Sequence, residues 1–327
     1  MKKRIWLGAL LALGVLGCTG NPTVSNSNPY GLPSSVSLAM PDSLKTVSAL
    51  KTVSAYRTQA TDFSIGEQIG AHLGIYMAST ELIDEALSTL SEAGLTPGQP
   101  KTFTEDGETL TALLEVKADH AVLSIGEGTS ATGENQIIGI SFTSPKQGRA
   151  VFRSREPIPG AGRFALETIF DLDAGKVSAN GYSDTTMLAE ADPQEFCVHW
   201  EFKTVKQAPA GVAPFTMRAS AFFSLPQNAD ESGVYAMVAN CLEDGSAAAI
   251  LGVQLPLLGP NFTLVPSDEN SGELGYFLGA NGKDLVASAA RSELKQLVPT
   301  RQTIYEPFPA DPSTMDVLSL PIYQFPK

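Results

Sequence analysis

The stretch EFCVHWEFKTV, residues 195–205, decides the fold class because its side chains alternate in character. The even positions are apolar and the odd positions are polar or reactive: Phe196, Val198, Trp200 and Phe202 against Cys197, His199, Glu201 and Lys203. A period of two places successive side chains on opposite faces of a β-strand. The stretch therefore predicts a strand with one face in the core.

The same alternation recurs along the middle of the chain. Nine further segments show it: residues 109–119, 120–126, 136–144, 148–155, 163–173, 175–183, 213–225, 232–241 and 247–255. Short stretches rich in Gly, Pro, Asp, Asn or Ser separate them, whereas parallel strands need crossovers of a dozen or more residues. We therefore expect an antiparallel meander.

Two segments outside this region have helical spacing. Residues 64–94 carry apolar side chains three or four apart, with Ser64 and Glu67 as a capping box, and Gly66, Gly70, Gly74 and Ala78 beside them. Residues 284–299 predict a shorter helix that ends at Pro299. The expected fold class is α+β: an antiparallel curved sheet or partial barrel of about 8–10 strands, one long N-terminal helix and a short C-terminal helix.

The N-terminus has the parts of a bacterial export signal. A basic head, residues 2–4, precedes an apolar run, residues 5–16, which is too short to span a bilayer. The run ends in Val15-Leu16-Gly17-Cys18 and resembles the lipobox of bacterial lipoproteins. The resemblance implies cleavage before Cys18, attachment of lipid to its sulfur with acyl chains such as palmitate, and, from Thr19, the outer rather than the inner membrane. The alternative is an ordinary secretory signal.

This reading divides the chain into three parts. Residues 1–17 are the signal peptide, residues 18–60 the lipidated N-terminus and a flexible tether, and residues 61–327 a single soluble α+β domain. The tether is rich in Ser, Asn and Pro and carries the hexapeptide LKTVSA twice, at residues 44–49 and 50–55. Two short copies are too few for a repeat fold.

The charge of the chain restricts its partners. Residues 1–17 hold three basic and no acidic residues, so their removal changes the net charge from −13 to −16. A protein with this net negative charge repels nucleic acid and anionic lipid at long range, and it is therefore a poor candidate for binding either of them through its overall charge. We therefore expect membrane contact through the lipid anchor.

Two cysteines remain once Cys18 is assigned to lipid. Cys197 and Cys241 form an even pair in an oxidising compartment, which predicts a disulfide. Closing that loop would stabilise the fold by about 4 kcal/mol in the chain-entropy model. The alternative is two separate buried thiols.

Motifs for cofactors and metals are absent or incomplete. GEGTSA, residues 126–131, is followed by turn residues and a strand instead of the helix that a dinucleotide loop requires. The loop that begins at DENSGE, residues 268–273, has Glu273 where an EF-hand needs Gly and Gly279 where it needs Glu. FDLDAGKV, residues 170–177, carries Asp171 and Asp173, but its DAGK, residues 173–176, is typical of a hairpin turn. The three histidines, His72, His120 and His199, have no partner at metal spacing. We expect neither cofactor nor metal.

These observations favour a non-catalytic envelope protein over an enzyme. It would bind a hydrophobic ligand between the sheet and the long helix, or an envelope partner. The candidate ligand-binding residues are Trp200, Phe215, Met217 and Phe223. The alternatives are that this face is simply core, that the protein is an envelope hydrolase using dispersed Asp, Glu and His residues, or that it is a scaffold or adhesin.

Overall fold

A computed structural model gives the fold of the 327-residue chain. For residues 182–186, 193–200, 221–224 and a few others it describes the backbone alone. The described residues are 32, 36, 76–77, 79–88, 94–105, 107–153, 163–186, 193–204, 215–224, 233–241, 247–254, 263–264 and 276–278.

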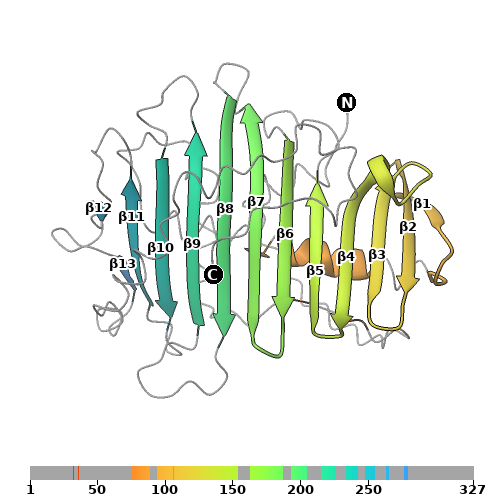
Figure 1. The fold of residues 1–327 in the computed structure, drawn as a ribbon, viewed down its shortest axis with the longest axis horizontal. Coiled ribbons are helices and arrows are strands. Elements are labelled where there is room, and N and C mark those ends of the chain that lie inside the picture. The colour runs from red at the N-terminus through yellow and green to blue at the C-terminus, as the bar shows by residue number, and fades with distance from the viewer. Residues whose placement is uncertain are drawn as a thin grey trace.

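One antiparallel sheet contains every described strand (Figure 1). Its members are β1 (Lys101–Glu105), β2 (Glu108–Val116), β3 (Ala121–Glu127), β4 (Gln136–Ser144), β5 (Gln147–Arg153), β6 (Arg163–Asp171), β7 (Lys176–Thr186), β8 (Pro193–Thr204), β9 (Phe215–Ser224), β10 (Gly233–Cys241), β11 (Ala247–Gln254), β12 (Thr263–Leu264) and β13 (Tyr276–Leu278). The order in the sheet from β1 to β12 is the order in the sequence, and β13 also pairs with β11. A short 3-10 helix, η2 (Gly133–Asn135), precedes β4.

The β6–β7 turn shows how local chemistry fixes one of these connections. Asp171 accepts a hydrogen bond from the backbone N–H of Ala174 at 2.9 Å, and Gly175 adopts φ +62°, a conformation that favours glycine. The Gly175 carbonyl then accepts the N–H of Thr204 from β8 at 2.7 Å. The hairpin turn predicted at residues 173–176 is confirmed, since β6 ends at Asp171 and β7 begins at Lys176.

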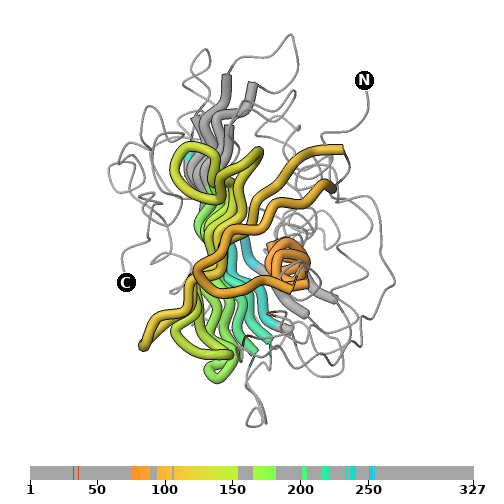
Figure 2. Tube along the Cα trace, turned by 90° about the vertical axis from the view of Figure 1, so that its right-hand side faces the viewer, coloured from red at the N-terminus to blue at the C-terminus, as the bar shows by residue number. Residues whose placement is uncertain are grey.

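A helix packs on one face of this sheet. Residues 76–77 and 79–88 are helical, and we call this element the 76–88 helix. It lies behind the sheet in Figure 1 and to one side of it in Figure 2. Its inward residues, Tyr76, Ile83, Ala86 and Leu87, are buried, and the Tyr76 ring lies 4.5 Å from that of Phe202, centroid to centroid. No described helix is long and apolar enough to cross a membrane.

The strand registers sort the sheet residues into two faces. The near face, toward the 76–88 helix, carries the apolar core, with Ile140 in β4, Phe170 in β6, Phe202 in β8 and Met217 in β9. The opposite face we call the far face. Phe202 is buried and its neighbour Lys203 is exposed, which confirms the alternation read from residues 195–205.

The predicted fold class is wrong in strand number, helices and form. All ten alternating segments form strands, β2 to β11, but three more strands join them in one open sheet. β1, β12 and β13 are short edge strands of two to five residues, too short to display a period.

The helices also differ from the prediction. The described residues contain no long N-terminal helix and no C-terminal helix. Residues 64–75 and 89–93 of the first prediction, and all of residues 284–299 of the second, lie outside the described residues.

The predicted disulfide does not fit the strand register. Cys197 pairs with Phe222 of β9 and lies on the far face, whereas Cys241 pairs with Phe215 of β9 and lies on the near face. Seven residues along β9 and two strand spacings separate them, which amounts to about 25 Å. A disulfide needs Cα atoms within about 7 Å. The two cysteines are not disulfide-bonded, and the alternative of two separate thiols is the one that fits.

Candidate functional site

Polar residues of four neighbouring strands align across the far face. The registers pair Glu167 of β6 with Asn180 of β7, Asn180 with His199 of β8, and His199 with Ser220 of β9. Facing residues in an antiparallel sheet have Cβ atoms about 4.5–5.5 Å apart. These positions therefore form one continuous line, which we call the polar row.

Glu167 is the charged end of the polar row. Its side chain is 1% exposed, and its two oxygens accept hydrogen bonds from Arg149 Nε at 2.5 Å and from Asn180 Nδ2 at 2.6 Å. A buried carboxylate without such donors would be strongly destabilising. The Arg149 side chain is 31% exposed, so the ion pair connects the buried row to solvent.

Ser220 is the other end of the polar row. It is fully buried, and among the described residues its Oγ has no hydrogen-bond partner. The register places His199 directly beside it, and Asn180 on the other side of His199. An unsatisfied buried hydroxyl costs about 1–3 kcal/mol, so natural proteins keep few of them.

The polar row contains the residue types of acyl-transfer chemistry. A serine hydroxyl beside an imidazole, with an amide and a carboxylate beyond it, is the set that activates a serine nucleophile. Burial of Ser220 limits its contact with a substrate in this conformation. The row can alternatively serve as a satisfied polar layer that specifies how β6 to β9 pair.

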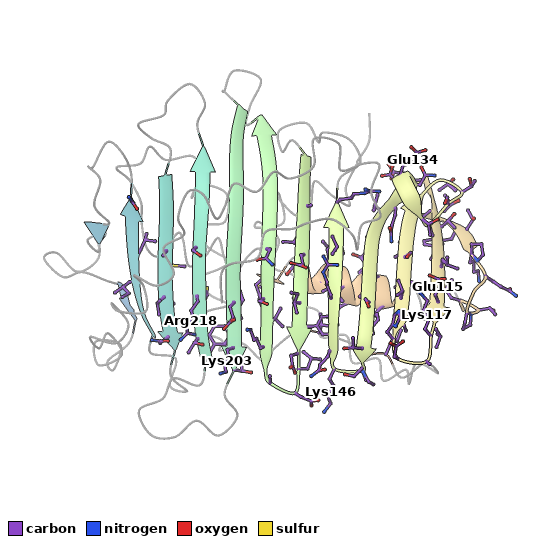
Figure 3. All side chains as sticks on the ribbon, viewed as in Figure 1. Glu115, Lys117, Glu134, Lys146, Lys203 and Arg218 are labelled. Carbon is purple, nitrogen blue, oxygen red and sulfur yellow. The ribbon has the colours of Figure 1, made fainter. Side chains whose placement is uncertain are left out.

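A group of charged residues lies beside the polar row, at the ends of β7, β8 and β9. Lys176 faces Lys203, Lys203 faces Thr216, and Glu201 faces Arg218. We call Lys176, Lys203 and Arg218, together with Glu201, the basic cluster. Figure 3 shows Lys203 and Arg218 together near one end of their strands.

The contacts within the basic cluster involve two of its three cations. Glu201 pairs with Lys176 at 2.5 Å, and Arg218 donates to Thr216 Oγ1 at 3.0 Å. Lys203 is exposed, and no ion pair among the described residues includes it. Facing lysines repel each other, so this arrangement costs stability.

The four predicted ligand-binding residues share the near face. Phe215 and Met217 are buried in the core, and the Phe215 ring lies 5.8 Å from that of Phe202. The registers place Trp200 and Phe223 on the same face, opposite Ala219 and Phe196 respectively. Phe215 and Met217 belong to the same buried cluster as Phe202 and Tyr76 of the 76–88 helix.

The remaining predicted sites fall in two groups. Cys18, His72 and residues 268–273 lie outside the described residues. His120 lies in the exposed β2–β3 turn and hydrogen-bonds Asp119 at 2.7 Å, which lowers the pKa of that carboxyl. Within the described residues, no three His, Cys, Asp or Glu side chains are close enough together to hold a metal ion.

Comparison with protein-family models, with curated proteins and with solved structures finds no match for this chain.

Sequence reasoning did not single out the polar row. Glu167, Asn180 and Ser220 come from three strands that are far apart in the sequence, and they align only once the register is known. A weak signal exists, because each is a polar residue in the middle of an alternating segment. Lys203 and Glu201 stand on the polar side of residues 195–205, and the same alternation identifies their face.

Proposed function

We propose that this chain is a lipid-anchored bacterial envelope protein, held at the outer membrane through Cys18, that binds an anionic partner through the basic cluster. The observation that carries the binding site is the exposed Lys203, which faces Lys176 at a cost in stability and has Arg218 on the next strand. The N-terminal pattern that resembles a lipobox supports the anchor.

The charge of the whole protein makes the basic cluster distinctive. Three cations and one carboxylate give the four residues a charge of about +2, and Asp171, which faces Lys176, lowers the local charge to about +1, whereas the chain has a net charge of −13. A local cationic site on an acidic protein attracts carboxylate or phosphate groups at short range while the overall field repels nonspecific polyanions. Arginine is also enriched at interfaces because it donates several hydrogen bonds in a fixed geometry.

The near face supports the partner proposal over a hydrophobic ligand. Phe202, Phe215 and Met217 fill one another's space there. A ligand at this place would have to displace packed side chains, and core packing strongly resists such displacement.

Site-specific photo-crosslinking tests the partner. A photoreactive residue at position 203, in cells that make the lipidated chain, should give one specific adduct, and Arg218→Glu should abolish it. Glu115 is the matched control position, because it is exposed on the same face but six strands away, on β2. Equal adducts from positions 203 and 115, or an adduct that survives Arg218→Glu, would contradict the proposal.

Fractionation tests the anchor separately. The natural chain should sediment with the outer membrane and carry acyl chains, because several acyl chains together give stable attachment. Cys18→Ala should release the protein into the soluble fraction. Sedimentation of both forms with the membrane would show that Cys18 is not the anchor.

An envelope hydrolase is the second candidate, and the unpartnered hydroxyl of Ser220 favours it. In that mechanism Ser220 Oγ attacks an acyl carbon, His199 takes the hydroxyl proton and passes it to the leaving alcohol, and water then releases the acyl group. A fluorophosphonate probe should label Ser220 with loss of fluoride, and Ser220→Ala should prevent labelling. Ser178, on the far face of β7, is the control serine. Labelling that persists in Ser220→Ala would exclude the mechanism.

A further inference from the structure

Two residues far upstream of the sheet are packed into the domain. Val36 is fully buried within the core cluster, and Leu32 packs against the same cluster. The backbone N–H of Val36 donates to Asp84 Oδ1 at 2.8 Å, in the middle of the 76–88 helix. Both residues belong to the predicted tether, residues 18–60. At least these two points of that stretch are therefore attached to the domain.

We infer that the helix surface around Asp84 is a binding site for an upstream segment of the same chain, occupied by Leu32 and Val36, and that this docking limits how far the domain stands from the membrane. The second half of this statement rests on the proposed lipid at Cys18. The first half rests on the contacts of Val36 alone.

The chemistry of the site suits an extended peptide. Asp84 accepts the main-chain N–H of Val36, and hydrogen bonds to a charged acceptor are stronger than neutral ones. Its neighbour Ile83, with Ala86 and Leu87, is buried in the same cluster as the Val36 side chain. One carboxylate thus recognises the backbone, and an apolar surface takes the Val36 side chain, a combination found in other modes of peptide recognition.

The docking changes the reach of the domain by a large factor. Leu32 is fourteen residues from Cys18, and a fully extended chain spans at most about 3.4 Å per residue, so the limit is about 48 Å. If Leu32 and Val36 were released, the next attachment described in the structure would be Tyr76, fifty-eight residues from Cys18. The limit would then be about 200 Å.

Hydrogen exchange tests the binding site without the lipid. In the chain from Thr19 onward, the Val36 amide should exchange at least about a hundredfold more slowly than an open peptide. Asp84→Ala should accelerate this exchange at least about tenfold, because the acceptor is lost. Asp84→Asn keeps an oxygen acceptor and should retain most of the protection. Glu81→Ala, one turn away on the same helix, is the matched control and should leave the exchange unchanged.

Exchange of the Val36 amide at the open-peptide rate in the natural chain would overturn the inference. Equal exchange in Asp84→Ala and the natural chain would also overturn it. Because neither result depends on Cys18, failure here is distinguishable from failure of the proposed anchor.

Layer height on a supported bilayer tests the consequence for reach. By neutron reflectometry, the protein layer of the lipidated chain should begin within about 48 Å of the bilayer surface, and its outer edge should lie no more than that distance plus the size of the domain away. The double variant Val36→Asp, Asp84→Ala should form a taller layer, provided that its far-ultraviolet circular dichroism matches that of the natural chain. If the variant loses the sheet spectrum, Asp84→Ala alone is compared. If a folded variant has a fast-exchanging Val36 amide but an unchanged layer height, the docking of Leu32 and Val36 does not limit the reach of the domain.

Discussion

Replacing Arg149 by Met tests how the buried carboxylate of Glu167 is held. The change removes one of its two donors and leaves the apolar part of the side chain in place. Removal of one partner of a buried ion pair costs about 3–5 kcal/mol, and an unsatisfied charged group about 1–3 kcal/mol or more. Because Arg149 itself is 31% exposed and Asn180 remains, we expect about 3 kcal/mol.

Replacing the acidic partner, Glu167, should destabilise the protein less than replacing Arg149. In Glu167→Gln the amide oxygen can still accept from Asn180, and the partly exposed guanidinium of Arg149 can turn to water. We expect about 1 kcal/mol for Glu167→Gln. The double variant should be more stable than Arg149→Met alone, since it leaves no uncompensated buried charge.

Urea unfolding followed by circular dichroism measures all four proteins, with the free energy of unfolding extrapolated to water. The result that matters is the order: Arg149→Met least stable, the double variant between it and Glu167→Gln. Equal costs for the two single variants, or a cost below about 0.5 kcal/mol for Arg149→Met, would refute the argument that burial of Glu167 sets the asymmetry.

Three further predictions concern the register, one turn and pH. The denatured chain from Thr19 onward should show two free thiols without reductant, Cys197 and Cys241; none in a monomer would contradict the register. Gly175→Ala should lower the free energy of unfolding in urea by about 3 kcal/mol, because the added Cβ would lie 2.5 Å from a backbone oxygen of β8. Gly128→Ala, which adds its Cβ in open space, should lower it by about 1 kcal/mol. The hydrogen bond from the N–H of Ala174 is the main cause that lowers the pKa of Asp171, so Asp171→Asn should lower Tm at pH 7. The difference in Tm between the natural chain and the variant should disappear as the pH falls through that lowered pKa. A difference in Tm that stays constant down to about pH 2 would contradict this prediction.

The sequence determined the strands well because each alternating segment reports its own two faces. Phe202 and Lys203 fall on the expected sides, and all ten segments form strands. The edge strands were missed because residues such as Lys101–Glu105 are short and polar, as exposed edges commonly are. The bounds of the first helix could not be fixed from the sequence, since helical spacing predicts which side is buried and not where a helix begins.

The candidate site was beyond sequence reasoning for a different reason. The pairing of Asn180 with His199 and of His199 with Ser220 depends on the register between strands. A shift of one residue would move Ser220 to the near face. The disulfide prediction was wrong for the same reason, because the number of cysteines and the compartment say nothing about which face of a sheet each cysteine occupies.

The order of the strands has a consequence for how the chain folds. Every strand from β2 to β11 pairs with the strand that precedes it in the sequence. Sheet contacts are therefore local along the chain, a low contact order that favours fast folding for an all-antiparallel sheet. A chain of this kind can add each strand to a growing edge in the order of its synthesis or export. The contact between Tyr76 and Phe202 cannot form until β8 is in place, so this end of the helix packs only after the strands from β1 to β8 have formed.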